Sequence, residues 1–184
     1  MKSVLISIKP QWCELIASGQ KTVEVRKTKP RLETPFKVYI YETQGSTDTP
    51  FVDEEGHYIF KGRGEVIGEF VCDHIEEIGF SPYNHGEYIC KDQSFIKQSC
   101  VPFNEMFDYL GEEYGYGWHI TDLVIYDKPR DLIEFCRNGE CSKCGWLENG
   151  KCYKRVEQST YNNHRVKRPP QSWCYVEGRA NDET

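Results

Sequence analysis

The sequence contains no long apolar segment. Its first apolar run, at residues 4–6, is interrupted by Ser7 and Lys9, and no segment has the length of a membrane span or of a signal-peptide apolar region. We therefore expect a cytoplasmic protein without a membrane contact. In a reducing compartment its nine cysteines are expected to be metal ligands, core thiols or catalytic groups rather than disulfides.

Common catalytic motifs are also missing. The sequence has no H-x-E, H-E-x-x-H, G-x-S-x-G or P-loop motif, and no internal repeat or low-complexity tract. A single histidine in an apolar context, such as His119 between Trp118 and Ile120, is typical of a structural residue. Any enzymatic chemistry would have to come from Lys21 and Glu24.

Basic residues are fewer than acidic ones, 23 against 29, which gives a formal net charge of -6, and they are unevenly distributed. Residues 1–40 carry 8 Lys and Arg against 3 Asp and Glu, residues 41–127 carry 4 against 18, and residues 128–184 carry 11 against 8. The two ends of the chain could therefore form one basic surface, although an incidental basic stripe on an acidic protein is the alternative. Its members would be Lys21, Arg26, Lys27, Lys29, Arg31, Arg165, Lys167 and Arg168.

The N-terminal segment has a strand, helix and strand pattern. The β-prone run ends before Pro10, which suits the first position of a helix, and Gly19 is a typical helix stop. Residues 22–26 alternate, so that Val23 and Val25 would face a core while Thr22, Glu24 and Arg26 share the other face, with Lys21 at the turn. That face suits a planar polar ligand or a phosphate. A solvated strand face with ion pairs is the alternative.

Further elements follow from periodicity. Strands are expected at residues 36–41, 64–72, 75–80 and 118–125, and a helix at 102–110. In that helix Phe103, Met106, Phe107 and Leu110 recur at helical spacing, which predicts core packing. Length and composition predict one domain spanning residues 1–184, with a Cys-rich insertion at 136–168.

Four cysteines crowd into that insertion with metal-ligand spacing, at Cys136, Cys141, Cys144 and Cys152. A C-x2-C pair offers two thiolates to one tetrahedral ion, and four thiolates make a closed, structural zinc site. An iron–sulfur cluster, a redox-active Cys141/Cys144 pair and unliganded thiols remain alternatives. Cys174 or His164 could replace Cys136 as the fourth ligand.

Several motifs resemble those of a known family, the ASCH domain, a relative of the PUA RNA-binding barrel. They are Ser7-Ile-Lys9-Pro10, the signature Gly19-x-Lys21-x-x-Glu24-x-Arg26, Gly64 to Phe70, and Tyr116 to Ile120. This resemblance spans most of residues 1–135. A longer pattern that continues through Tyr126 to Pro129 and Pro169 to Glu177 is similar to ASCH proteins of phages and Gram-positive bacteria.

The resemblance implies a mainly β, α+β fold: a PUA-like mixed β-barrel with flanking helices, here with a small zinc loop. It also implies binding of single-stranded RNA, a nucleotide or a nucleoside in a polar cleft. The expected ligand-binding residues are Lys9, Trp12, Lys21, Thr22, Glu24, Arg26, Tyr41, Gln171, Ser172 and Trp173. In the C-terminal part of this set, Gln171, Ser172 and Trp173 would close one wall of the cleft, or alternatively complete the barrel with Trp173 in the core.

Two other functions stay open at this point. Some small ASCH proteins resemble amidohydrolases that deacetylate N4-acetylcytidine, using a lysine at the position of Lys21 and a threonine where this chain has Glu24. A Lys21/Glu24 pair could still activate water for amide or RNA hydrolysis, and Thr22 could supply a hydroxyl. The third function is a protein-interaction module using the zinc loop and the acidic middle of the chain.

Overall fold

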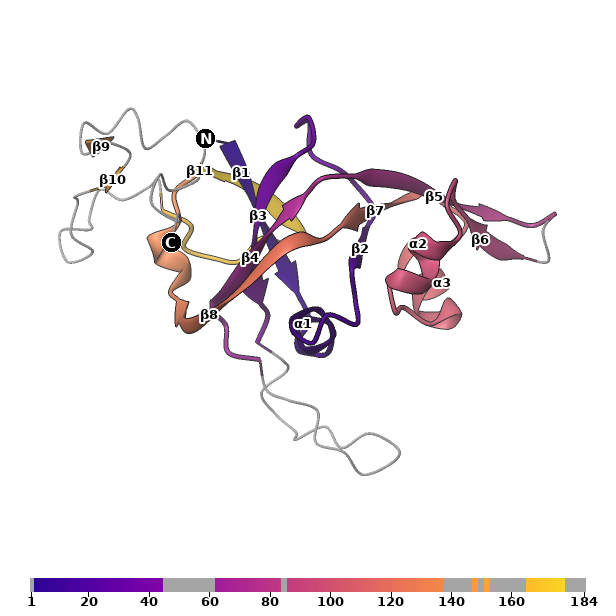
Figure 1. The fold of residues 1–184 in the computed structure, drawn as a ribbon, viewed down its shortest axis with the longest axis horizontal. Coiled ribbons are helices and arrows are strands. Elements are labelled where there is room, and N and C mark those ends of the chain that lie inside the picture. The colour runs from indigo at the N-terminus through magenta and orange to yellow at the C-terminus, as the bar shows by residue number, and fades with distance from the viewer. Residues whose placement is uncertain are drawn as a thin grey trace, which may run out of the picture. The chain divides into compact units, whose positions relative to one another are not determined.

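The computed structural model describes residues 2–44, 62–83, 86–137, 147–148, 151–152 and 165–177 (Figure 1). The chain divides into two compact units. The first unit contains Met1–Pro10, Lys37–Glu69 and Val124–Thr184, and the second contains Gln11–Phe36 and Phe70–Leu123. Neither unit is continuous in sequence, because the chain passes from one to the other four times.

A five-stranded sheet organises the first unit. Its order is β11-β1-β3-β4-β8, and its strands are β1 (Lys2–Ile8), β3 (Phe36–Glu42), β4 (Val66–Cys72), β8 (Thr121–Arg130) and β11 (Trp173–Glu177). The interior strand β1 pairs in parallel with β3 and antiparallel with β11. Every residue of β1 after Lys2 is buried, as expected for a strand covered on both faces.

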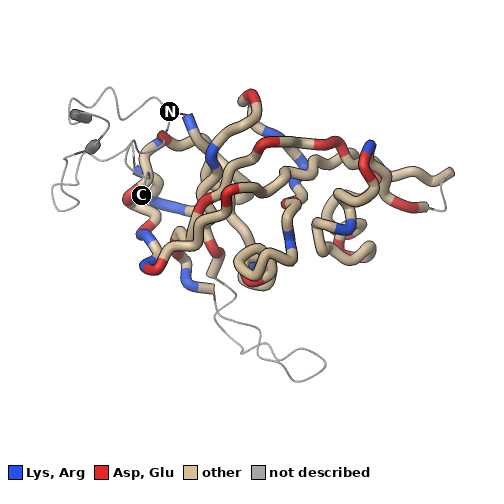
Figure 2. The backbone as a smooth tube through the Cα atoms, in the orientation of Figure 1, with Lys and Arg blue, Asp and Glu red and all other residues tan. Residues whose placement is uncertain are grey.

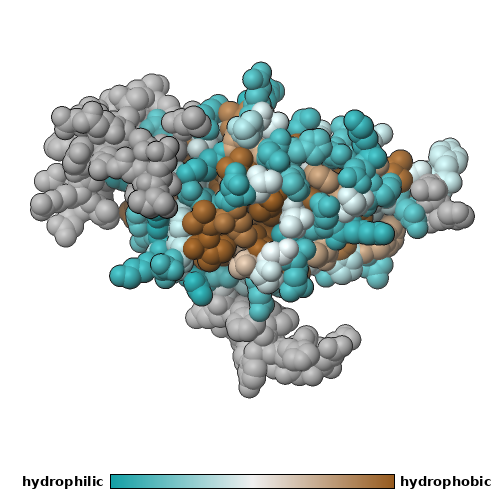
Figure 3. Space-filling view, in the orientation of Figure 1, coloured by the Kyte–Doolittle hydropathy of each residue, from teal (hydrophilic) through white to brown (hydrophobic). Residues whose placement is uncertain are grey.

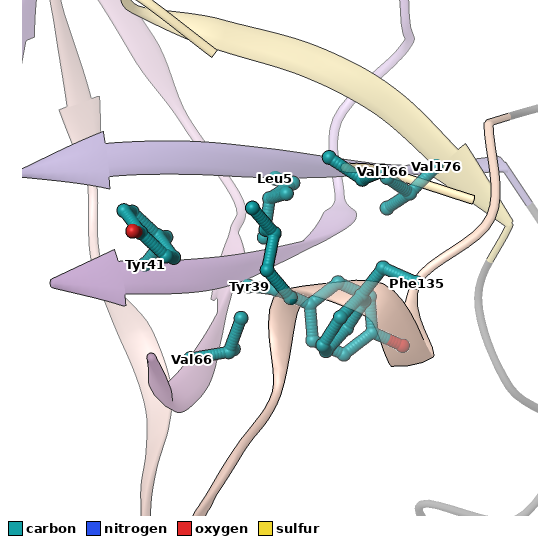
Figure 4. Close-up of a cluster of buried hydrophobic side chains, with 8 residues drawn as sticks. Leu5, Tyr39, Tyr41, Val66, Phe135, Val166 and Val176 are labelled. Carbon is teal, nitrogen blue, oxygen red and sulfur yellow. The ribbon is translucent and has the colours of Figure 1, made fainter. Parts of the chain in front are cut away.

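The core of the first unit lies where β1 and β3 pack against the segment after β8. Its buried members are Leu5, Tyr39, Tyr41, Val66, Leu132, Phe135, Val166 and Val176 (Figure 4). The Tyr39 and Phe135 rings meet edge to face with centroids 4.9 Å apart. Leu132 belongs to a short 3-10 helix, Leu132–Glu134, which Asp131 and Glu134 close with a capping box.

Two very short strands follow in the Cys-rich segment. They are β9 (Leu147–Glu148) and β10 (Lys151–Cys152). They pair antiparallel, with Cys152 opposite Leu147. Cys152 is thereby placed on a hairpin strand.

The second unit is built on a four-stranded sheet of order β2-β7-β5-β6. These strands are β2 (Val23–Arg26), β5 (Ile75–Ser81), β6 (Glu87–Ile89) and β7 (Gly115–His119). The chain also forms helices α1 (Pro10–Ala17), α2 (Ser94–Gln98) and α3 (Phe103–Leu110). The buried cluster of this unit is Val25, Ile78, Tyr88, Met106 and Leu110.

The predicted α+β, mainly β class is confirmed, whereas the predicted closed barrel is not. The two larger sheets of the described residues, with five and four strands, are both open, each with two edge strands. The strand predicted at residues 118–125 is divided at Ile120, between the end of β7 and the start of β8, and the Ile120 N–H donates to the Thr22 carbonyl. Within the described residues, no helix is both long and apolar enough to span a membrane.

The prediction that four apolar side chains of α3 pack in the core was wrong in part. Met106 and Leu110 are buried, as expected, but Phe103 and Phe107 are 48% and 38% exposed. The two exposed rings stack on each other with centroids 6.0 Å apart. Helical spacing identified the face of α3 correctly, but the face is wider than the core that it covers.

Candidate functional site

The local fold carries Lys21 from the end of a helix to the start of a strand. Gly19 has φ 74°, the left-handed value that favours glycine. The Gly19 N–H donates to the Ile16 carbonyl, and the Gln20 and Lys21 N–H groups both donate to the Leu15 carbonyl, each at 2.9 Å. The turn therefore fixes the backbone of Lys21 before β2 begins.

Three charged side chains form a connected group, which we call the Lys21–Glu24–Arg26 network. Lys21 Nζ lies 3.3 Å from Glu24 Oε2, and Arg26 Nη2 lies 2.9 Å from Glu24 Oε1. Lys21 Nζ also donates to the Ser99 carbonyl at 2.5 Å. One carboxylate thus accepts from two cations, one through each oxygen.

The network is buried. The side chains of Lys21, Glu24 and Arg26 are 0%, 7% and 9% exposed, and all four residues of β2 are buried. The alternative of a solvated strand face therefore does not fit the structure. Buried charges are tolerated when they are paired and hydrogen-bonded, which is the arrangement seen here.

Lys21 is fully engaged in this group. Besides Glu24 and Ser99, its ammonium lies 5.2 Å from the centroid of the Trp12 ring on α1, a cation–π distance. Trp12 itself is half-exposed, so part of its ring is open to other contacts. Lys21 consequently fits the role of a positioning residue that fixes Glu24 and Trp12.

Sequence reasoning missed the Ser99 carbonyl. Ser99 follows α2, a short helix that no periodicity predicted, and it comes next to Lys21 because Thr22 N–H donates to the Gln98 carbonyl at 3.1 Å. The Ser99 residue is 0% exposed. A main-chain acceptor leaves no trace in sequence, so no motif could have indicated it.

Thr22 also lies in the second unit, where its N–H donates to the Gln98 carbonyl and its carbonyl accepts from the Ile120 N–H. The remaining predicted ligand residues belong to the first unit. They are Lys9, Tyr41, Gln171, Ser172 and Trp173. Some of them lie together at the end of β1, where Ser7 is the register partner of Tyr41. Ser7 Oγ donates to the Pro170 carbonyl at 2.6 Å, and the Ser7 N–H donates to the Ser172 carbonyl at 2.9 Å. Burial, followed by the negative charge of Asp131, raises the pKa of Tyr41.

Trp173 begins β11 and pairs with Ile6 of β1. It is half-buried and meets Tyr175 edge to face with ring centroids 5.3 Å apart. The segment therefore completes the five-stranded sheet, but without Trp173 in the core. Its participation in ligand binding, together with Gln171 and Ser172, stays a prediction.

Three members of the predicted basic surface are buried, namely Lys21, Arg26 and Arg165. Arg165 is 7% exposed, and its Nη1 donates to the Glu134 carbonyl at 2.9 Å. It therefore has a structural role in the first unit. Lys167 and Arg168 in that unit, and Lys27, Lys29 and Arg31 in the second, are exposed.

The predicted zinc site lies mostly outside the described residues, which exclude Cys141, Cys144 and His164. Cys136 is buried, and its carbonyl accepts from the Glu177 N–H at 3.0 Å. Cys174 is half-buried against the first core, and burial raises the pKa of its thiol. Within the described residues no group of three or more His, Cys, Asp or Glu side chains could hold a metal ion.

Two histidines in the second unit have acidic partners. His119 Nδ1 lies 2.8 Å from Asp73 Oδ1, and His74 Nε2 lies 3.1 Å from Glu76 Oε1. Both imidazole rings pack against Phe95, with centroids 5.9 Å and 5.5 Å from its ring. This arrangement gives His119 the satisfied, structural surroundings that its sequence context predicted.

No protein-family model and no curated protein matches the chain. Solved structures do match over nearly the whole length. The ASCH structure from Zymomonas mobilis has a TM-score of 0.52 at 18% identity and covers 94% of this chain and 86% of that chain. A tyrosine-to-phenylalanine mutant of that protein gives 0.54 at 18%, covering 97% and 93%. A serine-to-alanine mutant gives 0.52 at 17%, covering 96% and 89%.

The structural likeness agrees with the motifs in the sequence. The signature Gly19-x-Lys21-x-x-Glu24-x-Arg26 forms the turn and strand of the buried network, and Trp118 pairs with Glu24 in the β2/β7 register. At this level of identity the comparison concerns the fold. The chain therefore has the fold of the ASCH domain.

Proposed function

We propose that the protein binds a nucleotide, either free or within RNA, at the Lys21–Glu24–Arg26 network. The observation that carries this proposal is the connected buried ion pair next to a half-exposed tryptophan. A guanidinium recognises phosphate, a carboxylate accepts from a base N–H, and an indole stacks on a base. These three chemistries are found together within one unit of the fold.

The roles follow from exposure and from existing contacts. The side chains of Arg26 and Glu24 are 9% and 7% exposed, so these exposed edges would contact the ligand, while Lys21 holds Glu24 in place. Preorganised charges of this kind reduce the cost of ordering side chains on binding. Trp12 would supply the ring face.

Binding of mononucleotides and short RNA, followed by fluorescence or calorimetry, tests the proposal. Arg26→Lys keeps the charge but removes the planar donor array, and should weaken binding about tenfold. Trp12→Leu should also weaken it, since base stacking contributes about 1–3 kcal/mol. Glu24→Gln should change base preference more than overall affinity.

Thermal unfolding of each variant separates a loss of binding from a loss of fold. Glu14→Gln, on the exposed surface of α1, is a control that should bind like the wild type. Unchanged affinity in a folded Arg26→Lys protein, or no nucleotide binding by the wild type, would exclude this function and favour a protein partner.

The geometry supports binding better than hydrolysis. A base N–H can share a Glu24 oxygen, because a carboxylate has about four acceptor positions, whereas a general base must take up a proton, and here each oxygen faces a cation. Incubation with N4-acetylcytidine or RNA should accordingly leave both compounds intact. Release of acetate or of RNA fragments, abolished in Glu24→Gln, would establish the hydrolase alternative.

We also propose a structural zinc ion held by Cys141, Cys144 and Cys152, with Cys136 as the fourth ligand. Four thiolates suit zinc, and Cys152 follows Cys141 and Cys144 in the sequence and lies on the short strand β10, which pairs with β9. Metal analysis should find about one zinc per chain. The double variant Cys141→Ser, Cys144→Ser should lose the metal and unfold at lower temperature. Metal-free wild-type protein of equal stability would contradict the proposal, and bound iron would identify a cluster instead.

A further inference from the structure

Exposed lysines lie next to two tyrosine rings, exposed Tyr109 and half-buried Tyr116, just after the buried network in the second unit. Lys27 Nζ lies 5.3 Å from the centroid of the Tyr109 ring, and Lys29 Nζ lies 4.9 Å from that of Tyr116. Both lysines are exposed, as is Arg31, and Tyr109 is 37% exposed. We call the two lysine–tyrosine pairs the basic–aromatic ladder.

The ladder is continuous with the network through the sheet. Tyr116 of β7 is the register partner of Arg26, the last residue of β2, and Lys27 is the next residue. Lys and Arg positions gather along β2 and the loop after it in Figure 2. Of the seven Lys and Arg residues in this unit, five lie between Lys21 and Arg31.

Each lysine–tyrosine pair has the chemistry that one nucleotide needs. The ammonium attracts a phosphate, and the ring offers a face on which any base can stack. Alternation of positive groups with aromatic rings is the general design of surfaces that bind single strands without reading their sequence. Neither group is buried, so neither needs a structural partner to be tolerated.

We propose that the ladder binds the nucleotides that flank the one held by the network. This inference rests on the proposed function and extends it: the ligand is a single-stranded polynucleotide several residues long, rather than a free nucleotide. The network recognises one nucleotide, and the ladder adds affinity that depends on the length of the polynucleotide but not on its base sequence.

The acidic groups around the ladder favour a single strand over a duplex. Glu77 of β5 is the register partner of Tyr116, and α3 exposes Glu105 and Asp108 on the helix that carries Tyr109. A duplex would bring a second row of phosphates toward these carboxylates. A single strand can place its phosphates at Lys27 and Lys29 alone.

Affinity measured against length tests the ladder. The probes are uridine monophosphate and the octamers of uridine and of thymidine deoxynucleotides, each titrated at several salt concentrations. For the wild type, an octamer should bind at least about tenfold more tightly than the monophosphate, since stacking on each ring contributes about 1–3 kcal/mol. The RNA and DNA octamers distinguish which polynucleotide gains more.

The double variant Lys27→Ala, Lys29→Ala should lose most of this length dependence and still bind the monophosphate within about twofold. Each lost phosphate contact lowers the slope of log affinity against log salt by about 0.7 for a single strand, so the slope should fall by about 1.4. The control Lys91→Ala, Lys97→Ala removes the same charge from two exposed lysines of the same unit and should keep both the slope and the length dependence.

The outcomes separate the two proposals. If the monophosphate binds but octamers bind no more tightly, or if both double variants behave alike, the ladder is excluded while the network remains. If octamers bind through Lys27 and Lys29 but Arg26→Lys has no effect on any probe, the ladder stands and the network function falls. If no probe binds the wild type, both fall.

Discussion

At the residue scale, Glu24 is the centre of the site because two cations depend on it. Lys21 has lost its hydration, with a side chain that is 0% exposed, and a buried ammonium is costly without a carboxylate partner. Ser99 supplies only a neutral carbonyl. The stability of this part of the fold is therefore tied to the same carboxylate that we assign to ligand binding.

Glu24→Gln should lower the free energy of unfolding by about 3 kcal/mol, because removal of one partner leaves a buried charge uncompensated. Denaturant unfolding followed by tryptophan fluorescence measures the change. The exposed Glu14→Gln should remain within about 0.5 kcal/mol of the wild type. Equal stability of the Glu24 variant and the wild type would show that Lys21 and Arg26 do not require this carboxylate.

The thiol of Cys72 should make the free energy of unfolding depend on pH in the alkaline range. Burial raises the pKa of its thiol from 9.0 to about 12, and its Sγ donates to the His74 carbonyl at 3.4 Å. Between these values the unfolded chain releases the proton while the folded chain keeps it, so the unfolded state gains stability as pH rises. The contribution of Cys72 should fall by up to about 1.4 kcal/mol per pH unit above pH 9.

Cys72→Ser isolates this effect, because a serine hydroxyl does not titrate in this range and can still donate to His74. The difference in unfolding free energy between wild type and variant should be constant from pH 6 to 8. Above pH 9 the difference should shift in favour of the variant. Parallel curves up to pH 11 would mean that the folded thiol titrates normally.

At the element scale, the turn after α1 determines where β2 begins. Gly19 has φ 74°, and the space around a Cβ at this position is empty, so a side chain would be opposed by backbone conformation alone. Gly19→Ala should therefore cost about 1 kcal/mol. Gly19→Asn should cost less, since asparagine tolerates this conformation.

Ser18→Ala is the control for the two Gly19 variants, because Ser18 is exposed and does not have a positive φ. Thermal unfolding of the three variants should rank Ser18→Ala above Gly19→Asn and Gly19→Asn above Gly19→Ala. The reverse order of the two Gly19 variants would show that the turn does not depend on the left-handed conformation.

Sequence periodicity was sufficient for elements whose surroundings are simple. Pro10 and Gly19 mark the ends of α1 to within two residues, and strand patterns matched β3 to β5 closely. The alternation in β2 was correctly predicted, but it could not show that the polar face is buried too. That burial depends on Ser99 and on chain segments distant in sequence, which local pattern does not encode.

The exposure of apolar side chains on the edge strand β8 could not be predicted from the sequence either. β8 is an edge strand of its sheet, and it exposes consecutive aliphatic side chains, with Val124 and Ile125 50% and 40% exposed. β8 crosses the face of the molecule shown in Figure 3. Consecutive apolar residues usually indicate a buried strand, and only the position of β8 in the sheet order shows otherwise.

At the scale of the whole molecule, the division of the chain constrains how it can unfold. Each unit has its own core, around Phe135 in the first and Met106 in the second. Yet β4 and β8 each have residues in both units, and the chain passes between the units four times. Unfolding of either unit would therefore disrupt two strands that also have residues in the other unit.

We consequently expect one cooperative unfolding transition. Phe135→Ala and Met106→Ala each create a cavity that should cost about 2–5 kcal/mol. Although the substitutions lie in different units, each should shift the whole transition to lower temperature. In either variant, the slowly exchanging amide protons of both β1 and β7 should exchange faster than in the wild type. Two separate transitions, or faster exchange confined to the substituted unit, would show that the units unfold independently despite the strands they share.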